Sequence, residues 1–197
     1  ELSVLIWPDS PLQKSAGQSP KFPLAERLYF LDAIRYVTRT VPLADNENEQ
    51  DKLQHLSPQI WADVENPLNA AREKICSEQK IEYRVFKSNE LNGFPESPPV
   101  IQISNRKKVV VTGSFDWFHS GHVRFLEEAS EYGDLYVIVG HDVNIRLLKG
   151  AGHPLLSQEE RRYIVGSIKF VTRALISSGD GWLDADPEIQ KLKPDIY

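Results

Sequence analysis

The chain has almost no sulfur: its 197 residues include one cysteine, Cys76, and no methionine. A single cysteine excludes an internal disulfide, and chains without disulfides are typical of a reducing compartment. The opening residues also lack the pattern of a secretory signal. We therefore expect a cytoplasmic protein.

Long apolar runs and an excess of positive charge are also missing. The apolar run at residues 135–139 is among the longest, whereas crossing a bilayer takes about 20 apolar residues. Lys and Arg total 23 against 28 Asp and Glu, which leaves a net charge of −5. An acidic chain has no field that attracts a nucleic-acid backbone or an anionic membrane. We therefore expect neither a nucleic-acid partner nor stable insertion into a membrane.

The length fits one large domain or two small ones, and an internal repeat favours two. Residues 26–39 and 160–173 are identical at seven of 14 positions, at an offset of 134. Residues 2–9 resemble 135–142 at an offset of 133, and residues 57–61 resemble 193–197 at an offset of 136. Three matches in the same order indicate a tandem duplication.

The offsets predict two related units, each incomplete in this sequence. The first unit covers residues 1–91 and lacks the strand, loop and helix with which the second begins. A linker dense in turn-forming residues covers 92–105. The second unit covers 106–197 and lacks a C-terminal part.

Hydrophobic spacing and turn residues predict strands that alternate with helices along the whole chain. That order is typical of an α/β fold with a Rossmann-like parallel sheet and helices on both faces. In such sheets ligands bind beyond the carboxyl ends of the strands. The expected strands are residues 2–7, 38–42, 59–64, 81–86, 108–112, 135–139 and 172–176, and the expected helices are residues 23–37, 52–56, 67–79, 121–132, 158–170 and 184–192.

The most informative segment is residues 109–122, which read VVVTGSFDWFHSGH. An apolar strand ends here, and Gly113 allows a turn that a side chain would obstruct. A helix begins close to Gly121, and its free N–H groups would favour a phosphate. His119 and His122 are three residues apart across the helix start, so both side chains can face the same anion.

The motif GSFDxxHxGH resembles the signature of the nucleotidyltransferase superfamily that includes the cytidylyltransferases. Residues 133–142, 149–150, 158–161 and 167–171 are similar to later segments of that family. The likeness is greatest to the CTP:phosphoethanolamine cytidylyltransferases, which are themselves tandem pairs, and next to the glycerol-3-phosphate cytidylyltransferases.

The resemblance implies transfer of CMP from CTP to a small phosphorylated alcohol, as a step of phospholipid synthesis. The implied acceptor is phosphoethanolamine first and glycerol 3-phosphate second, Mg²⁺ would accompany the CTP, and pyrophosphate would leave without a covalent intermediate. The implied catalytic residues are His119, His122 and Lys149, the last on a mobile loop. The implied nucleotide-binding residues are Gly113, Ser114, Phe115, Gly121 and Arg161, and the implied substrate-binding residues are Asp116, Asp142 and Lys169.

Plainer roles stay open for several of these residues. Arg161 and Lys169 lie eight residues apart on the predicted helix at residues 158–170. There they would either offer two cations to phosphate or form a solvated face. Asp116 would otherwise cap the helix that follows it, and Asp142 would otherwise be an N-cap.

Two other functions also stay open. Adenylyltransferases that use ATP share the His-x-Gly-His loop, and the motif does not show which base is bound. A non-catalytic nucleotide-binding module is the second alternative, because the family's late serine- and threonine-rich segment does not occur before Tyr197. No metal site is expected, since His119 and His122 have no third ligand spaced nearby. The partners that the resemblance implies are CTP and a phosphomonoester. Association of two copies into a homodimer also stays open.

Overall fold

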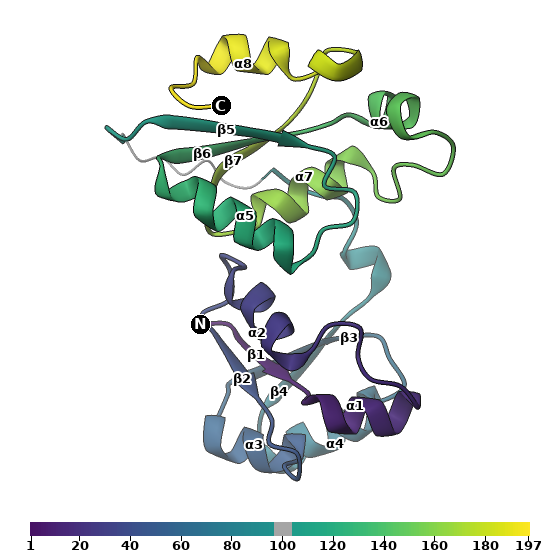
Figure 1. The fold of residues 1–197 in the computed structure, drawn as a ribbon. Coiled ribbons are helices and arrows are strands. Elements are labelled where there is room, and N and C mark those ends of the chain that lie inside the picture. The colour runs from purple at the N-terminus through teal and green to yellow at the C-terminus, as the bar shows by residue number, and fades with distance from the viewer. Residues whose placement is uncertain (97–103) are drawn as a thin grey trace. The chain divides into compact units, whose positions relative to one another are not determined.

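The computed structural model describes residues 1–96 and 104–197 (Figure 1). These residues form two compact units, each built from separate stretches of chain. The larger unit contains Glu1–Val4, Ala25–Thr40 and Phe94–Tyr197, and the smaller unit contains Leu5–Leu24 and Val41–Gly93. Residues 97–103, which belong to the predicted linker, lie outside the described part of the chain.

The larger unit contains a parallel sheet of three strands. β5 (Lys108–Gly113), β6 (Asp134–Val139) and β7 (Val171–Ile176) are paired in that order, all parallel. Ile196 forms a further parallel bridge to Val109 on the outer side of β5. The strand order therefore reverses beside β5, and such a reversal is where α/β sheets bind ligands.

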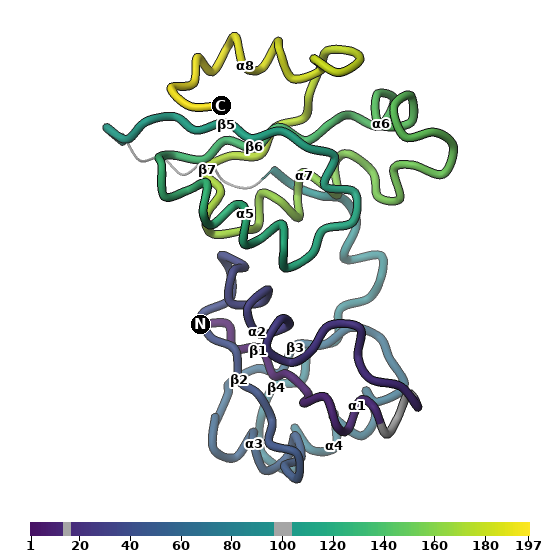
Figure 2. Tube along the Cα trace, in the orientation of Figure 1, coloured from purple at the N-terminus to yellow at the C-terminus, as the bar shows by residue number. Residues whose placement is uncertain are grey.

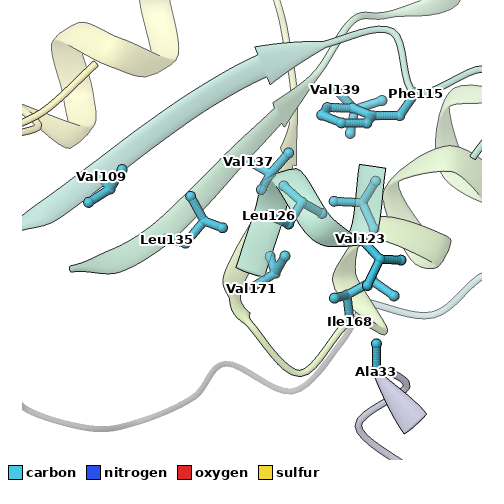
Figure 3. Packing of buried hydrophobic residues seen from close by; sticks show 11 residues of the cluster. Ala33, Val109, Phe115, Val123, Leu126, Leu135, Val137, Val139, Ile168 and Val171 are labelled. Atoms are coloured by element: carbon cyan, nitrogen blue, oxygen red, sulfur yellow. The ribbon is translucent and has the colours of Figure 1, made fainter. Parts of the chain in front are cut away.

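Helices cover both faces of this sheet. α5 (Ser120–Glu131) and α7 (Gln158–Gly166) lie on one face, and α8 (Asp186–Leu192) lies on the other (Figure 1). Successive strand residues point to opposite faces. Both faces are therefore apolar, which confirms the expected α/β fold with a parallel sheet. The first face packs Val109, Leu135, Val137, Val139 and Val171 against Val123 and Leu126 of α5 (Figure 3), and the second packs Val110 and Ile138 against Ala185, Ile189 and Leu192.

The sequence analysis missed a helix after β6. α6 (Asp142–Lys149) begins where His141 Nδ1 accepts a hydrogen bond from Asn144 N at 3.3 Å, and it ends at Gly150, whose φ is 88°. A helix of only eight residues gives little periodic signal, so its apolar positions were not recognised. The prediction that Lys149 lies on a loop is therefore wrong, because it is the last residue of α6.

α7 is shorter than predicted. It ends at Gly166 rather than residue 170, because the backbone that follows pairs with a different segment. Ile34 and Ile168 form an antiparallel bridge, Arg35 N donates to Ser167 O at 2.9 Å, and Lys169 N donates to Ala33 O at 2.8 Å. We call residues 33–35 and 167–169 the strand joint. Its paired positions, 34 and 168, are equivalent in the predicted repeat.

Residues 3–56 have the element order strand, helix, helix, strand, helix, and residues 134–192 have the same order with a short 3₁₀ turn, η2 (Gly181–Leu183), before the last helix. Both stretches can be followed along the trace in Figure 2. α1 (Asp9–Ala16) and α6 differ by 133 residues at both ends. α2 (Leu24–Asp32) and α7 differ by 134 at both ends, and α3 (Glu49–Leu56) and α8 both end on a leucine, 136 residues apart. β1 (Ser3–Ile6) precedes α1 as β6 precedes α6, and β2 (Arg39–Pro42) follows α2 as β7 follows α7.

The smaller unit has its own core. β3 (Ile60–Val64) and β4 (Glu82–Phe86) pair in parallel, joined by α4 (Asn69–Gln79). β1 and β2 pair in a separate two-stranded sheet, and a short 3₁₀ turn, η1 (Ser88–Glu90), follows β4. The buried residues at the centre are Leu53, Cys76 and Ile81, packed by Leu5, Trp61, Ile75 and Tyr83. Across residues 1–96 and 104–197, no helix combines the length and the apolar character that crossing a membrane demands.

Candidate active site

The loop between β5 and α5 depends on a close approach at Gly113. A Cβ atom on Gly113 would lie 3.0 Å from the ring of Phe115, tighter than ordinary van der Waals contact. Phe115 itself is 5% exposed and has a φ of 48°, in the left-handed region that bulky residues avoid. A residue held in such a conformation costs roughly 1–3 kcal/mol and is typical of functional loops.

His119 and His122 hold each other at the start of α5. His119 Nδ1 accepts a hydrogen bond from Gly121 N at 3.1 Å, and His122 Nδ1 accepts one from His119 N at 3.3 Å. The ring centroids are 4.0 Å apart. Because each Nδ1 is an acceptor, each neutral ring carries its proton on Nε2. The pair therefore offers two Nε2–H donors to a ligand.

The surroundings of His122 keep its ring neutral. The ring stacks on Phe118, with centroids 5.4 Å apart and an interplanar angle of 14°, and meets the edge of Phe115 at 5.5 Å. Burial, followed by the positive charges of His119 and Lys149, lowers the pKa of His122 below its usual value. A neutral His122 can donate from Nε2 at pH 7 without carrying a charge of its own.

Lys149 supplies the positive charge of the site. It ends α6, and its Nζ donates to Ser114 Oγ at 2.7 Å. Ser114 and Lys149 are 35 residues apart in the chain, so the fold brings them together. The predicted residues Ser114, His119, His122 and Lys149 thus gather around one loop.

Arg161 is a buried brace beneath this loop. Its side chain is fully buried, and Nε donates to Leu156 O at 3.0 Å. One terminal nitrogen donates to Ser114 O at 2.5 Å, and the other to Asp142 Oδ1 at 2.7 Å. These protein partners direct the guanidinium into the scaffold. Arg161 therefore fixes the backbone of the nucleotide loop predicted from the sequence.

Asp116 anchors a second loop against the first. It is 6% exposed and accepts hydrogen bonds from Leu155 N at 2.6 Å, Leu156 N at 3.2 Å and His153 Nδ1 at 2.9 Å. Burial alone would raise the pKa of Asp116, but these hydrogen bonds and the charge of Arg161 lower that pKa overall. His119, rather than Asp116, caps α5.

His153 is a residue that sequence analysis missed. It lies 37 residues from Asp116, in a segment without a helical or strand pattern, so no local signal connected the two. The site also differs from prediction at Asp142, which is the first residue of α6 and follows the N-cap His141. Asp142 joins the site through Arg161.

Lys169 lies apart from the other predicted site residues. Its side chain is exposed and its Nζ donates to Asp32 O at 2.9 Å, beside the strand joint. The expectation that Lys169 shares a helix face with Arg161 is wrong, because α7 ends at Gly166.

A cavity of about 690 Å³ adjoins the two loops. It takes Asp116, Trp117 and Phe118 from the loop after β5, and Leu155 and Leu156 from the second loop. The remaining lining is mostly apolar, so the cavity suits part of an organic ligand. That lining consists of Phe30, Ile34, Tyr36, Tyr163, Ile164, Ser167 and Ile168.

The described residues offer no protein cage for a metal ion. Within residues 1–96 and 104–197, no group of three or more His, Cys, Asp and Glu side chains is placed to hold one. Mg²⁺ in nucleotide-dependent enzymes is commonly held by the substrate's phosphates and only one or two carboxylates.

Comparison with known proteins finds similarity in the second half of the chain. Residues 110–196 match the family described as cytidylyltransferase-like. An FAD synthase of Ferroglobus placidus is 44% identical over 91 residues, which are 46% of this chain and 56% of that protein. The bifunctional protein HldE of Campylobacter concisus is 36% identical over 110 residues, which are 55% of this chain and 23% of that protein.

Solved structures are also similar to part of this chain. The lipopolysaccharide core biosynthesis protein of Thermoplasma volcanium GSS1 is 29% identical, over 46% of this chain and 71% of that chain, with a TM-score of 0.40.

These findings support the wider cytidylyltransferase-like family, which contains the His-x-Gly-His loop, for residues 110–196. The chain spans about half the length of the FAD synthase and about a quarter of HldE. The relatives do not support the narrower likeness to the phosphoethanolamine enzymes or the assignment to phospholipid synthesis.

Proposed function

We propose that residues 106–197 transfer a nucleoside monophosphate from a nucleoside triphosphate to a phosphorylated acceptor, with release of pyrophosphate. The observation that carries this proposal is the pair of Nε2–H donors on His119 and His122, fixed at the N-terminus of α5. The ammonium group of Lys149 lies against the same loop. The site thus presents hydrogen-bond donors and a cation at the positive end of a helix, and these are groups that stabilise a triphosphate.

The reaction needs little covalent chemistry from the protein. A phosphate oxygen of the acceptor attacks the α-phosphorus in line, the bond to the bridging oxygen breaks, and pyrophosphate leaves. Negative charge grows on the leaving oxygens, where fixed donors stabilise it. His119, His122 and Lys149 would supply these donors, and Arg161 would hold the loop that places them. Mg²⁺ bound to the triphosphate would neutralise part of its charge.

We propose ATP as the nucleotide donor. The matched relative from Ferroglobus placidus is an FAD synthase, and FAD contains an adenine nucleotide. CTP with phosphoethanolamine is the second candidate, supported by the cytidylyltransferase-like family match and by the segments that follow the motif. Base recognition through paired hydrogen bonds gives large discrimination, because the wrong base leaves buried polar groups unpaired. The two donors should therefore differ clearly.

A pyrophosphate-release assay tests the proposal. ATP and CTP would each be combined, with Mg²⁺, with flavin mononucleotide, phosphoethanolamine or glycerol 3-phosphate. Release that depends on both substrates is the expected result. Nucleotide binding without release for every combination would instead identify a non-catalytic binding module.

Matched variants connect the activity to the histidines. His122→Asn keeps an oxygen that can accept from His119 N but has no Nε2–H, whereas His122→Gln places an amide N–H near that position. Loss of one such donor typically lowers kcat by about 10²–10³-fold. We expect that loss for His122→Asn and a smaller loss for His122→Gln. Equal, near wild-type turnover of both would place the reaction elsewhere.

We also propose that residues 1–91 and 106–197 are related units joined by residues 92–105. Support comes from the recurrence of α1 and α2 as α6 and α7, at offsets of 133 and 134. The two compact units of the structure do not follow these boundaries, because residues 25–40 belong to the larger unit, to which the strand joint connects them. Superposition of α2 with α7, together with the strands that flank them, tests this proposal.

A further inference from the structure

The Asp116–His153 pair has a fixed proton arrangement. Asp116 is buried and its pKa is lowered, so its carboxylate is ionised at neutral pH and can only accept hydrogen bonds. His153 Nδ1, 2.9 Å from Asp116 Oδ2, must therefore carry a proton. The second nitrogen, Nε2, is then a lone-pair acceptor in the neutral ring and a donor in the imidazolium. This arrangement is the reverse of that in His119 and His122, whose neutral rings carry the proton on Nε2.

The position of His153 is restrained from both sides. Four residues before it, Lys149 Nζ is bonded to Ser114. Two and three residues after it, Leu155 N and Leu156 N are bonded to Asp116. His153 is therefore held against the loop that leads from β5 to the histidine pair. Its side chain is 43% exposed, so a ligand can reach it.

The surroundings of His153 suit an acceptor better than the triphosphate. The cavity of about 690 Å³ is lined by Asp116, which pairs with His153, and by Leu155 and Leu156, which follow His153 in the chain. His153 itself is not a lining residue, so the cavity would take the body of an acceptor whose phosphate extends to His153. The charged groups near the pair are Arg161, whose charge acts on Asp116, and Lys149 at the start of the loop.

We propose that His153, oriented by Asp116, binds the phosphate of the acceptor and shares one proton with it. This inference rests on the nucleotidyl transfer proposed above. When the acceptor binds as a monoanion, it passes its proton to His153 Nε2, which leaves a phosphate dianion beside an imidazolium. When the acceptor binds as a dianion to a ring that is already protonated, the same pair results. The dianion oxygen then attacks the α-phosphorus, and pyrophosphate leaves with the electrons of the broken bond. His153 touches substrate, and Asp116 is a positioning residue.

The shared proton predicts a bell-shaped dependence of kcat/KM on pH. The productive pair holds one proton, so activity falls at low pH, where the phosphate and the ring are both protonated, and at high pH, where both have lost their protons. The second pKa of a phosphomonoester is about 6, so the acceptor phosphate should give the profile one of its two limbs near that pH.

His153→Asn in the full chain tests the proposal. The amide N–H of asparagine can still donate to Asp116, but nothing replaces Nε2. With the acceptor of highest turnover among flavin mononucleotide, phosphoethanolamine and glycerol 3-phosphate, we expect the acceptor KM to rise about 10- to 100-fold near pH 6, the range for a lost charged hydrogen bond. The nucleotide KM should not change, and the alkaline fall of kcat/KM should disappear.

Two outcomes would overturn the assignment. An unchanged acceptor KM with the alkaline limb retained would mean that His153 only supports the loop. A rise confined to the nucleotide KM would place His153 on the triphosphate.

A binding measurement separates this inference from the proposed reaction. Nitrogen-15 NMR of the histidine rings, with inorganic phosphate as the probe, needs no turnover. We expect His153 to keep its Nδ1 proton throughout, and added phosphate to raise the pH at which Nε2 loses its proton. If this NMR response is observed but no pyrophosphate is released, the proposed reaction is rejected, whereas the phosphate site at His153 is supported. A His153 ring that is unprotonated at Nδ1, or insensitive to phosphate, would reject the site itself.

Discussion

Replacing Arg161 with methionine should destabilise the larger unit by about 3–5 kcal/mol. The fully buried guanidinium bonds to Ser114 O, Leu156 O and Asp142 Oδ1. Removing one partner of a buried ion pair costs roughly 3–5 kcal/mol, because the other charge is left uncompensated. Asp142 is 30% exposed, so water can restore part of that loss. The carbonyl oxygens of Ser114 and Leu156 would also lose their donor, at about 1–3 kcal/mol each when they are left unpaired. Added to the reduced ion-pair loss, this cost gives the expected total of about 3–5 kcal/mol.

The choice of methionine isolates the polar contribution. Methionine fills a similar apolar volume and adapts to irregular gaps, so a cavity contributes little. Asp142→Asn is the matched control, because it removes the charge of the partner while both carbonyl bonds remain. We expect it to cost less than half as much as Arg161→Met. The double variant would measure the coupling between Arg161 and Asp142.

Native-state hydrogen exchange of the β6 amides is the suitable assay. β6 is the central described strand of the larger unit, so its slowest amides report the opening of that unit separately from the smaller one. A change below about 1 kcal/mol for Arg161→Met would refute the brace, since a surface ion pair contributes no more than that. Loss of activity with unchanged exchange would instead favour a direct contact with the nucleotide.

Three further predictions concern packing, surface charge and protonation. In Gly133→Ala, the new Cβ would lie 2.1 Å from Lys107 O. Thermal unfolding should therefore show a loss of more than about 2 kcal/mol, and a neutral result would contradict the close approach. Lys169→Ala should leave the KM of every substrate unchanged, because the lysine bonds to Asp32 O; a raised KM would restore its predicted role in substrate binding. Burial is the largest cause of the lowered pKa of His122. The neutral His122 ring therefore contributes to stability above about pH 6.5, and this contribution is lost as pH falls through the folded pKa. NMR titration should place its midpoint below 6.5, and a midpoint above that would contradict the neutral ring.

Local patterns predicted most of the larger unit. The strands at residues 108–112, 135–139 and 172–176 were each within one residue of β5, β6 and β7, because buried parallel strands are continuous apolar runs. The α5 prediction was displaced by one residue at each end. Short helices were less well predicted: of the eight-residue helices, α1 and α6 were missed and only residues 52–56 of α3 were predicted, because two turns hold few apolar positions to show a period.

The motif loop was also readable from the sequence. Gly113, His119, Gly121 and His122 lie within ten residues, so their relation depends on local backbone geometry that the residue types reveal. Gly121 shows the limit of such reasoning. The sequence placed it at the helix start, but only the structure shows that a Cβ there would lie 2.8 Å from the ring of His119.

By itself, the sequence determined the α/β class, the three strands of the larger sheet and the loop that carries His119 and His122, because each depends on residues that are neighbours along the chain. The tertiary structure alone decided the partners of Arg161, the pairing of Asp116 with His153 and the strand joint. Ser114 lies 47 residues from Arg161, His153 lies 37 residues from Asp116, and Arg35 and Ile168 of the strand joint are 133 residues apart. Whether such side chains meet depends on how the sheet and helices pack, and no local pattern records that packing. The joint also ended α7 at Gly166, since backbone groups that pair with residues 33–35 cannot also continue a helix.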